Sequence, residues 1–158
     1  MKKILFMMIT LGTLLSLNAK EIHVNDVLDN YIAAWNEHNL KKIDSFYAEN
    51  VLWYDLGYDY TTKGKKAVSK AITDAFLGSV ADMYWAKSGD VFVSGNTIVY
   101  EWVYGGTFNG SWGNKVIKNK VFEIKGLSTT TINKDGKIVA HKDYYNLLSF
   151  KKQLGLIK

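Results

Sequence analysis

The second half of this chain consists almost entirely of strand-forming segments, and this feature limits the possible folds more than any other. Segments 83–93 and 97–108 are rich in apolar, β-branched and aromatic residues and are separated by the turn sequence Ser-Gly-Asn. Segments 120–133 and 137–147 have the same character and are separated by Lys-Asp-Gly. Short turns between such segments predict β-hairpins. We therefore expect an antiparallel meander from position 83 onward.

The first half of the chain is predicted to be mainly helical. Apolar residues recur at spacings of three and four over 24–35, and similar stripes occupy 40–47 and 65–77. Residues 51–56 have the composition of a strand, and the turn-prone stretch 57–64 follows them. Three helices followed by a meander indicate an α+β fold, in which the helices pack on one face of a strongly curved antiparallel sheet. Such a sheet leaves a cone-shaped cavity beneath the helices, which is a natural site for a small molecule.

The amino end has the order of a secretory signal peptide. Two lysines precede the apolar run 4–17, and the small residue Ala19 ends the segment. That run is shorter than the ~20 residues of a membrane-spanning helix, and an uncleaved membrane anchor is the alternative. We expect a signal peptide at 1–19, a single mature domain at 20–158 and a periplasmic or secreted protein without a stable membrane span.

The composition argues against several kinds of site and partner. The chain has no cysteine, which excludes a disulfide, a thiol nucleophile and a thiolate metal site. Its histidines have no metal-ligand spacing, and its glycines form no phosphate-binding pattern. All 20 basic residues are lysines, and they are spread along the chain rather than concentrated as in nucleic-acid-binding proteins. We therefore expect no metal, no organic cofactor and no nucleic-acid partner.

Two segments near the start of the predicted domain resemble a known family. Residues 31–40, followed by 46–55, resemble the opening of a ketosteroid isomerase or SnoaL-like domain of the nuclear transport factor 2-like superfamily, without a gap as far as Val68. Three later runs resemble the last hairpin of SnoaL-like proteins: 125–127, 135–138 and 141–145. The resemblance implies the cystatin-like, ketosteroid isomerase-like α+β roll for the whole domain.

The resemblance to ketosteroid isomerase implies roles for three residues. Tyr31 matches the tyrosine that donates a hydrogen bond to the developing oxyanion, and Asp55 matches the aspartate that transfers the proton. Ser128 takes the place of the second donor, which is a protonated aspartate in the isomerase, and a serine is a weaker donor. Leu56 replaces the proline that usually follows the catalytic aspartate. Isomerisation of steroids is therefore not expected.

The resemblance to SnoaL-like cyclases points to a second carboxylate. Asp143 matches their general acid and base on the final strand, and His141, Asp143 and Tyr145 share one face of that strand. Limonene epoxide hydrolases, another related branch, need an Asp-Arg-Asp group that a chain without arginine cannot form. The candidate catalytic residues are Asp55, Asp143, Tyr31 and His141, and either aspartate is a candidate for the base.

Aromatic residues are the predicted walls of the cavity. Tyr31 and Trp35 are one helical turn apart, and Trp102 and Tyr104 point the same way from their strand. Rings at such spacings are usually part of the core, but five Trp and ten Tyr are a large number for one domain. The predicted ligand-binding residues are Trp35, Trp53, Trp102, Tyr104, Ser128 and Tyr145.

Three functions are compatible with these features. The first is an exported enzyme that acts on a small, largely apolar molecule by acid and base chemistry of the isomerase, cyclase or hydrolase type, with Tyr31 stabilising the oxyanion, helped by Ser128 or His141. The second is a non-catalytic module that carries an apolar or aromatic ligand. The third is a structural dimer whose cavity is filled. In each case we expect a homodimer that pairs through the convex face of the sheet.

Overall fold

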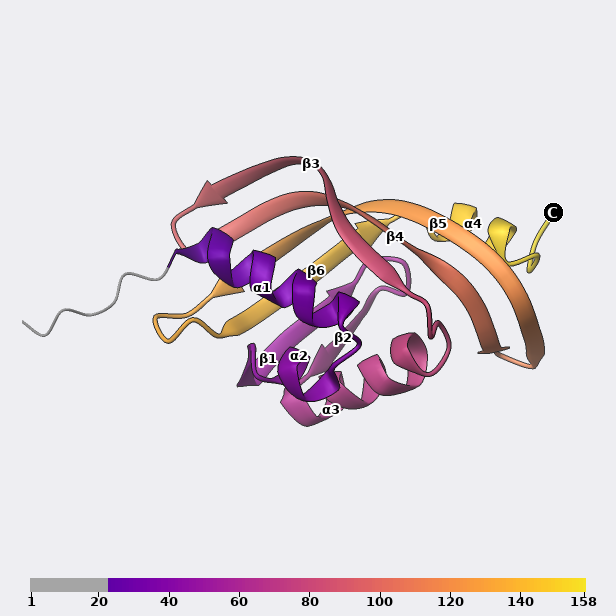
Figure 1. Ribbon diagram of the computed structural model, residues 1–158, viewed down its shortest axis with the longest axis horizontal. Coiled ribbons are helices and arrows are strands. Elements are labelled where there is room, and N and C mark those ends of the chain that lie inside the picture. The colour runs from indigo at the N-terminus through magenta and orange to yellow at the C-terminus, as the bar shows by residue number, and fades with distance from the viewer. Residues whose placement is uncertain (1–22) are drawn as a thin grey trace, which may run out of the picture.

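The computed structural model describes residues 23–158, and its main feature is one strongly bent sheet of six strands that arches over the helices (Figure 1). The strands are β1 (Tyr47–Asp55), β2 (Tyr60–Lys63), β3 (Tyr84–Ser94), β4 (Thr97–Trp112), β5 (Lys115–Ile132) and β6 (Ile138–Tyr145). Their order in the sheet is β2-β1-β6-β5-β4-β3. The pair β1–β6 is parallel, and the other neighbours are antiparallel.

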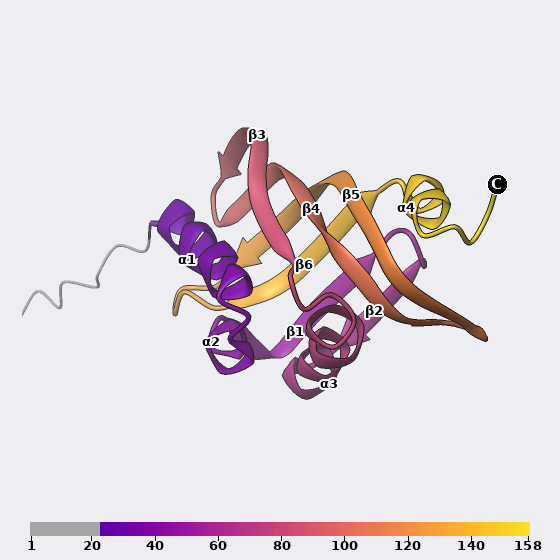
Figure 2. The same ribbon diagram turned by 45° about the vertical axis from the view of Figure 1, so that its right-hand side comes forward.

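The concave side of the sheet faces three helices (Figures 1 and 2). They are α1 (Val24–Asn36), α2 (Leu40–Asp44) and α3 (Lys65–Ala71), which continues directly into the π-helix η1 (Ile72–Leu77). A fourth helix, α4 (Leu147–Gln153), follows the last strand. Each helix in this part of the chain is too short or too polar to span a lipid bilayer. The predicted signal peptide, 1–19, lies outside the described residues.

The predicted fold class, α+β with three helices on a curved sheet, is confirmed. The predicted stripe on the first helix is also confirmed, because Leu28, Tyr31, Ile32 and Trp35 are buried against the sheet. The β4–β5 register shifts between Phe108 and Gly110, in the glycine-rich part of β4.

Several boundaries differ from the sequence prediction. The second helix ends at Asp44 instead of position 47, because Tyr47 begins β1 and pairs with β6. The stretch predicted as a turn contains β2, which pairs with residues 52–55 of β1. The sheet is not wholly antiparallel, because β1 and β6 run side by side in the same direction. Helix α4 was not predicted.

Two cross-strand rows bring the residues of the candidate site together on the concave face. Asp55 on β1 lies opposite Asp143 on β6, which lies opposite Ser128 on β5. The next row along the sheet contains Gly126, which lies between Tyr145 and Trp102. A Cβ atom on Gly126 would collide with the indole of Trp102, so glycine allows this ring to lie flat across the strand.

Candidate functional site

A cavity of about 860 Å³ lies between the concave face of the sheet and the helices. Most of its wall is aromatic, and indole and phenyl rings from α1, β1, η1, β3 and β4 pack edge to face or stacked. Trp53 and Phe76 stack with ring centroids 5.7 Å apart and an interplanar angle of 17°. A volume of this size accommodates a molecule of several fused or linked rings.

The inner polar centre of the cavity is Asp143, whose side chain accepts three hydrogen bonds. Trp53 Nε1 donates to Oδ2 over 2.6 Å, and Ser128 Oγ donates to Oδ1 over 2.5 Å. His141 Nε2 lies 2.9 Å from Oδ1. Burial raises the pKa of Asp143, but the charge of His141 and the hydrogen bonds from His141, Ser128 and Trp53 outweigh it. The pKa of Asp143 therefore lies below its ordinary value, and the carboxylate is held in its ionised form.

A second layer of buried donors fixes the groups that contact Asp143. Trp102 Nε1 donates to Ser128 Oγ over 2.7 Å, which leaves the serine proton for Asp143. His141 Nδ1 lies 2.9 Å from Thr130 Oγ1. Ser128, Thr130 and His141 are at most 1 % exposed. Because every member has a partner, this network holds the Asp143 carboxylate in one orientation.

Asp55 is the second carboxylate of the cavity, and its surroundings are different. Tyr145 Oη donates to Oδ2 over 3.1 Å, and the backbone N–H of Tyr58 donates to Oδ1 over 3.2 Å. Burial raises the pKa of Asp55, and the negative charge of Asp143 raises it further. These effects exceed the opposing hydrogen bonds, so the pKa of Asp55 lies above its ordinary value. Asp55 therefore takes up a proton more readily than Asp143 does.

Two phenols near the inner end of the cavity, Tyr31 and Tyr47, are protonated. The hydroxyl groups of Tyr31 and Tyr47 form a hydrogen bond with each other, and Tyr31 lines the cavity. Burial raises the pKa of both groups far above the ordinary value, as it does for Tyr104 on β4. Trp35 Nε1 is buried and has no hydrogen-bond partner within residues 23–158. This end of the cavity is therefore rich in donors and suits an oxygen acceptor of a ligand.

The outer part of the cavity lies between the β1–β2 turn and the far end of β4. Tyr58 stacks on Trp112 with ring centroids 5.9 Å apart, and Trp112 also packs against Phe150 of α4. All three residues line the cavity, and Tyr58 is exposed to solvent. An apolar molecule entering between these elements first meets aromatic rings.

The structure brings nine of the ten predicted site residues to the cavity wall. They are Tyr31, Trp35, Trp53, Asp55, Trp102, Tyr104, His141, Asp143 and Tyr145. Ser128 is fully buried behind Asp143 and is not part of the wall. Their roles in binding and catalysis remain predictions.

Sequence reasoning missed several wall residues. Trp85 on β3 and Trp112 on β4 could have been predicted. Trp53 and Trp102 also lie on strands and line the cavity, so a tryptophan on a predicted strand is itself a signal for the wall. Phe76 belongs to the predicted helix 65–77, but that part of the helix is the π-helix η1, whose geometry sets the direction of the Phe76 ring. A π-helix is rare and often marks a functional site, and it has no clear sequence pattern. Phe150 lies on the helix that was not predicted.

Comparisons with known proteins agree with this geometry. The profile of a family described as SnoaL-like polyketide cyclase matches residues 25–154. No curated protein sequence matches the chain. Among solved structures, a SnoaL-like polyketide cyclase from Shewanella denitrificans superposes with a TM-score of 0.74 at 18% identity, covering 85% of this chain and 98% of that one.

Two further solved structures contain small molecules. A Catenulispora acidiphila protein with a ketosteroid isomerase-like fold, in complex with trimethylamine, has a TM-score of 0.68 at 19% identity, covering 82% of this chain and 92% of that one. TerC, co-crystallised with polyporic acid, has a TM-score of 0.68 at 12% identity, covering 84% and 98%. At these identities the likeness establishes the fold alone.

Because the pKa values of Asp143 and Asp55 shift in opposite directions, replacing each by Asn should affect stability differently. Because the pKa of Asp143 is lowered in the folded protein, its stabilising effect is complete above the ordinary pKa of about 4 and disappears as the pH falls toward the lowered value. Asp143→Asn should lower the free energy of unfolding by about 3 kcal/mol at pH 7, because it breaks a buried charged network. The difference from wild type should shrink below about pH 4.

Asp55→Asn is the matched control, measured by urea unfolding over the same pH range. A raised pKa makes the ionised form of Asp55 unfavourable in the fold, so this variant should be no less stable than wild type at pH 7. A loss of stability in Asp55→Asn equal to that in Asp143→Asn would contradict the opposite pKa shifts of the two groups.

Proposed function

This chain belongs to the SnoaL-like polyketide cyclase family, and we propose that it binds a small, largely apolar carbonyl compound and catalyses proton transfer at the carbon next to the carbonyl group. The observation that carries the proposal is a pair of neighbouring carboxylates, Asp55 and Asp143, with opposite pKa shifts in one aromatic cavity. A general base works best when its pKa is close to the working pH. Asp55 is therefore the proposed base.

The proposed step uses groups that the cavity already positions. The Asp55 carboxylate removes a proton from the carbon beside the carbonyl, and the electron pair of that C–H bond moves to the carbonyl oxygen. The resulting enolate oxygen accepts a hydrogen bond from Tyr31, whose own oxygen accepts one from Tyr47. The enolate carbon then takes a proton back from Asp55, or it attacks a second carbonyl and closes a ring, and the new alkoxide oxygen takes the proton from Asp55. A positioned donor and base of this kind contribute roughly 10²–10⁴-fold each.

Asp143 has a positioning role in this proposal. Its ionised side chain is saturated by donors from Trp53, Ser128 and His141, so it is a poor proton acceptor. Its charge raises the pKa of Asp55. Removing that charge should make Asp55 more acidic and move the pH dependence of the reaction to lower pH.

The substrate class follows from the walls. Stacked and edge-to-face rings of Trp53, Phe76 and Trp85 favour a planar, ring-containing molecule over a flexible chain. Asp55 and Asp143 lie opposite each other on β1 and β6, and the Tyr31 ring packs against His141 on β6, which favours a molecule with its oxygen atoms at one edge. An aromatic ketone of two or three rings meets both requirements.

Exchange of a ketone's α-protons in D₂O tests this function directly. We use 2-tetralone, a bicyclic aromatic ketone, and follow the loss of its α-proton signal by NMR. Asp55→Asn should slow the protein-dependent exchange at least 100-fold, because the base is removed. In wild type the rate should rise with pH, with a midpoint above the ordinary Asp value of about 4.

Asp135→Asn is the control, because Asp135 lies exposed in the β5–β6 turn and far from the cavity. It should exchange at the wild-type rate. If Asp55→Asn also kept that rate while 2-tetralone still quenched tryptophan fluorescence, the cavity would be a binding site without catalysis. That result would favour the alternative function, a carrier of apolar ligands.

We also propose that the protein is a homodimer that pairs through the convex face of the sheet. Leu52 is exposed there on β1, beside a shallow groove that includes Tyr54 and Tyr144. Leu52→Asp places a charge at the centre of this apolar surface and should give a monomer in analytical ultracentrifugation. A wild-type monomer, or an unchanged dimer in Leu52→Asp, would contradict the proposed interface.

Export from the cytoplasm is a further proposal, and it rests on the order of charges and apolar residues before Ala19. Intact-mass measurement of the protein recovered outside the cytoplasm of an expressing bacterium should give a chain that begins at Lys20. Recovery of the uncut chain in the membrane fraction would favour an anchor instead.

A further inference from the structure

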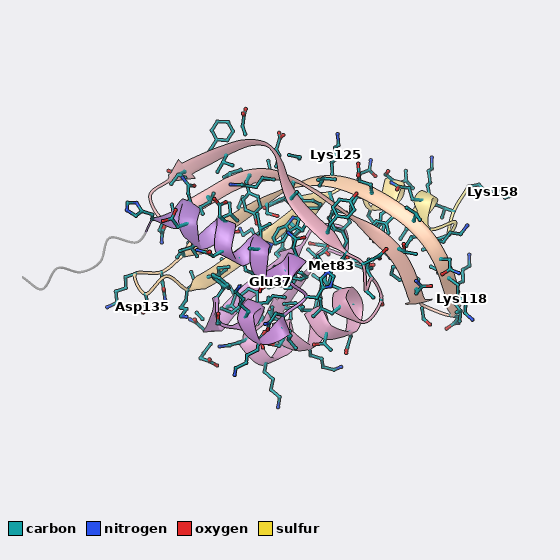
Figure 3. The ribbon with its side chains drawn as sticks, viewed as in Figure 1. Glu37, Met83, Lys118, Lys125, Asp135 and Lys158 are labelled. Carbon is teal, nitrogen blue, oxygen red and sulfur yellow. The ribbon has the colours of Figure 1, made fainter. Side chains whose placement is uncertain are left out.

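Lysines gather at the end of the molecule formed by the β4–β5 hairpin and the C-terminal segment. Residues 102–122 and 144–158 contain no Asp or Glu and include six lysines: Lys115, Lys118, Lys120, Lys151, Lys152 and Lys158. Figures 1 and 2 show the hairpin tip and α4 at the same end, and Figure 3 labels Lys118 and Lys158 there. Lys115 Nζ donates to the Leu156 carbonyl over 3.4 Å, and the Lys120 side chain lies close to Gly155.

The positive charge of this end, which we call the basic tip, is not neutralised by the protein. Four lysine–carboxylate ion pairs occur within residues 23–158, and each involves a lysine elsewhere in the fold: Lys42, Lys65, Lys70 or Lys87. The sequence prediction that lysines are simply spread over a solvated surface is therefore incomplete. Folding brings six of them together without an acidic partner.

Aliphatic side chains alternate with these lysines and are exposed. Val116 is 71 % exposed, Val121 75 % and Ile157 37 %. A basic surface with exposed aliphatic groups is typical of proteins that lie on an anionic bilayer, where lysines bind the headgroups and apolar side chains enter the interface. Nucleic-acid surfaces instead use arginine and exposed aromatic rings for stacking, and the chain has no arginine.

We propose that the basic tip docks on the surface of an anionic lipid bilayer. The cavity wall continues to this end through Trp112, Gly113 and Phe150. Docking in this orientation turns the outer part of the cavity toward the lipid, so an apolar molecule dissolved in the bilayer reaches the aromatic wall without crossing water. Docking through the basic tip does not depend on the role of Asp55 in catalysis.

A fluorescent label at the tip tests the docking. Because the chain has no cysteine, Val116→Cys gives a single attachment site for the polarity-sensitive nitrobenzoxadiazole group. With vesicles of equal parts phosphatidylglycerol and phosphatidylcholine, its emission should shift to the blue and increase. Pure phosphatidylcholine vesicles should give no shift, and added salt should reverse the shift, because the attraction is electrostatic.

Ser94→Cys is the matched label position, since Ser94 is exposed at the opposite end of the long β4 strand. Its label should not respond to the same vesicles. Both labelled proteins carry the same residues 1–22, so any contact that this segment makes with lipid is common to both. Equal shifts at the two positions would contradict docking through the tip.

A pair of double variants in the Val116→Cys background tests the lysines. Lys118→Gln with Lys120→Gln should weaken binding to the anionic vesicles about 25-fold, or roughly fivefold for each lysine. Lys41→Gln with Lys134→Gln removes the same charge from exposed positions outside the tip and should change binding less than about twofold. Equal losses in both double variants would overturn the proposal, as would a tip label that responds to duplex DNA and not to vesicles.

Discussion

The ionised carboxylate of Asp143 in the interior of the fold is the constraint on which the rest of the site depends. A buried charge of this kind is tolerated only when hydrogen-bond donors surround it. Here the donors come from β1, β5 and β6, and their own positions are fixed by Trp102 and Thr130. The network therefore joins four neighbouring strands, β1, β6, β5 and β4. It also leaves Asp143 with little capacity to accept a proton.

This arrangement assigns different roles to two acids that the sequence alone made equivalent. Asp143 supplies a fixed negative charge, while Asp55, one strand away and hydrogen-bonded to Tyr145, is the proposed base. The same fold serves proteins with different small molecules, so the chemistry is set by such local differences rather than by the architecture. In this chain the proposed ligand class rests on the aromatic wall, and the proposed choice of Asp55 as base rests on the difference between the two acids.

The sequence predicted the parts of the fold that have a clear period or turn signal. The apolar stripe ending at Trp35, the strand composition of 51–56 and the Asp135-Gly136 turn all correspond to structure. The sequence did not predict β2, because this strand is short and polar. It did not predict the π-helix either, because the apolar stripe of 65–77 fits an α-helix equally well. For the site, the family resemblance pointed to Asp55 and Asp143, and both line the cavity. The sequence did not predict the hydrogen bond that Trp102 Nε1 donates to Ser128 Oγ. The two residues are 26 positions apart, and the indole reaches Ser128 only because Gly126 has no side chain beneath it.

The central claim is that the fold raises the pKa of Asp55 and lowers the pKa of Asp143. Carbon-13 NMR of the aspartate side-chain carboxyl groups, assigned with the two Asn variants and followed from neutral to acid pH, measures this directly. The account predicts a midpoint for Asp55 above the ordinary aspartate value and a midpoint for Asp143 below it. Midpoints in the reverse order, or two ordinary midpoints, would contradict it.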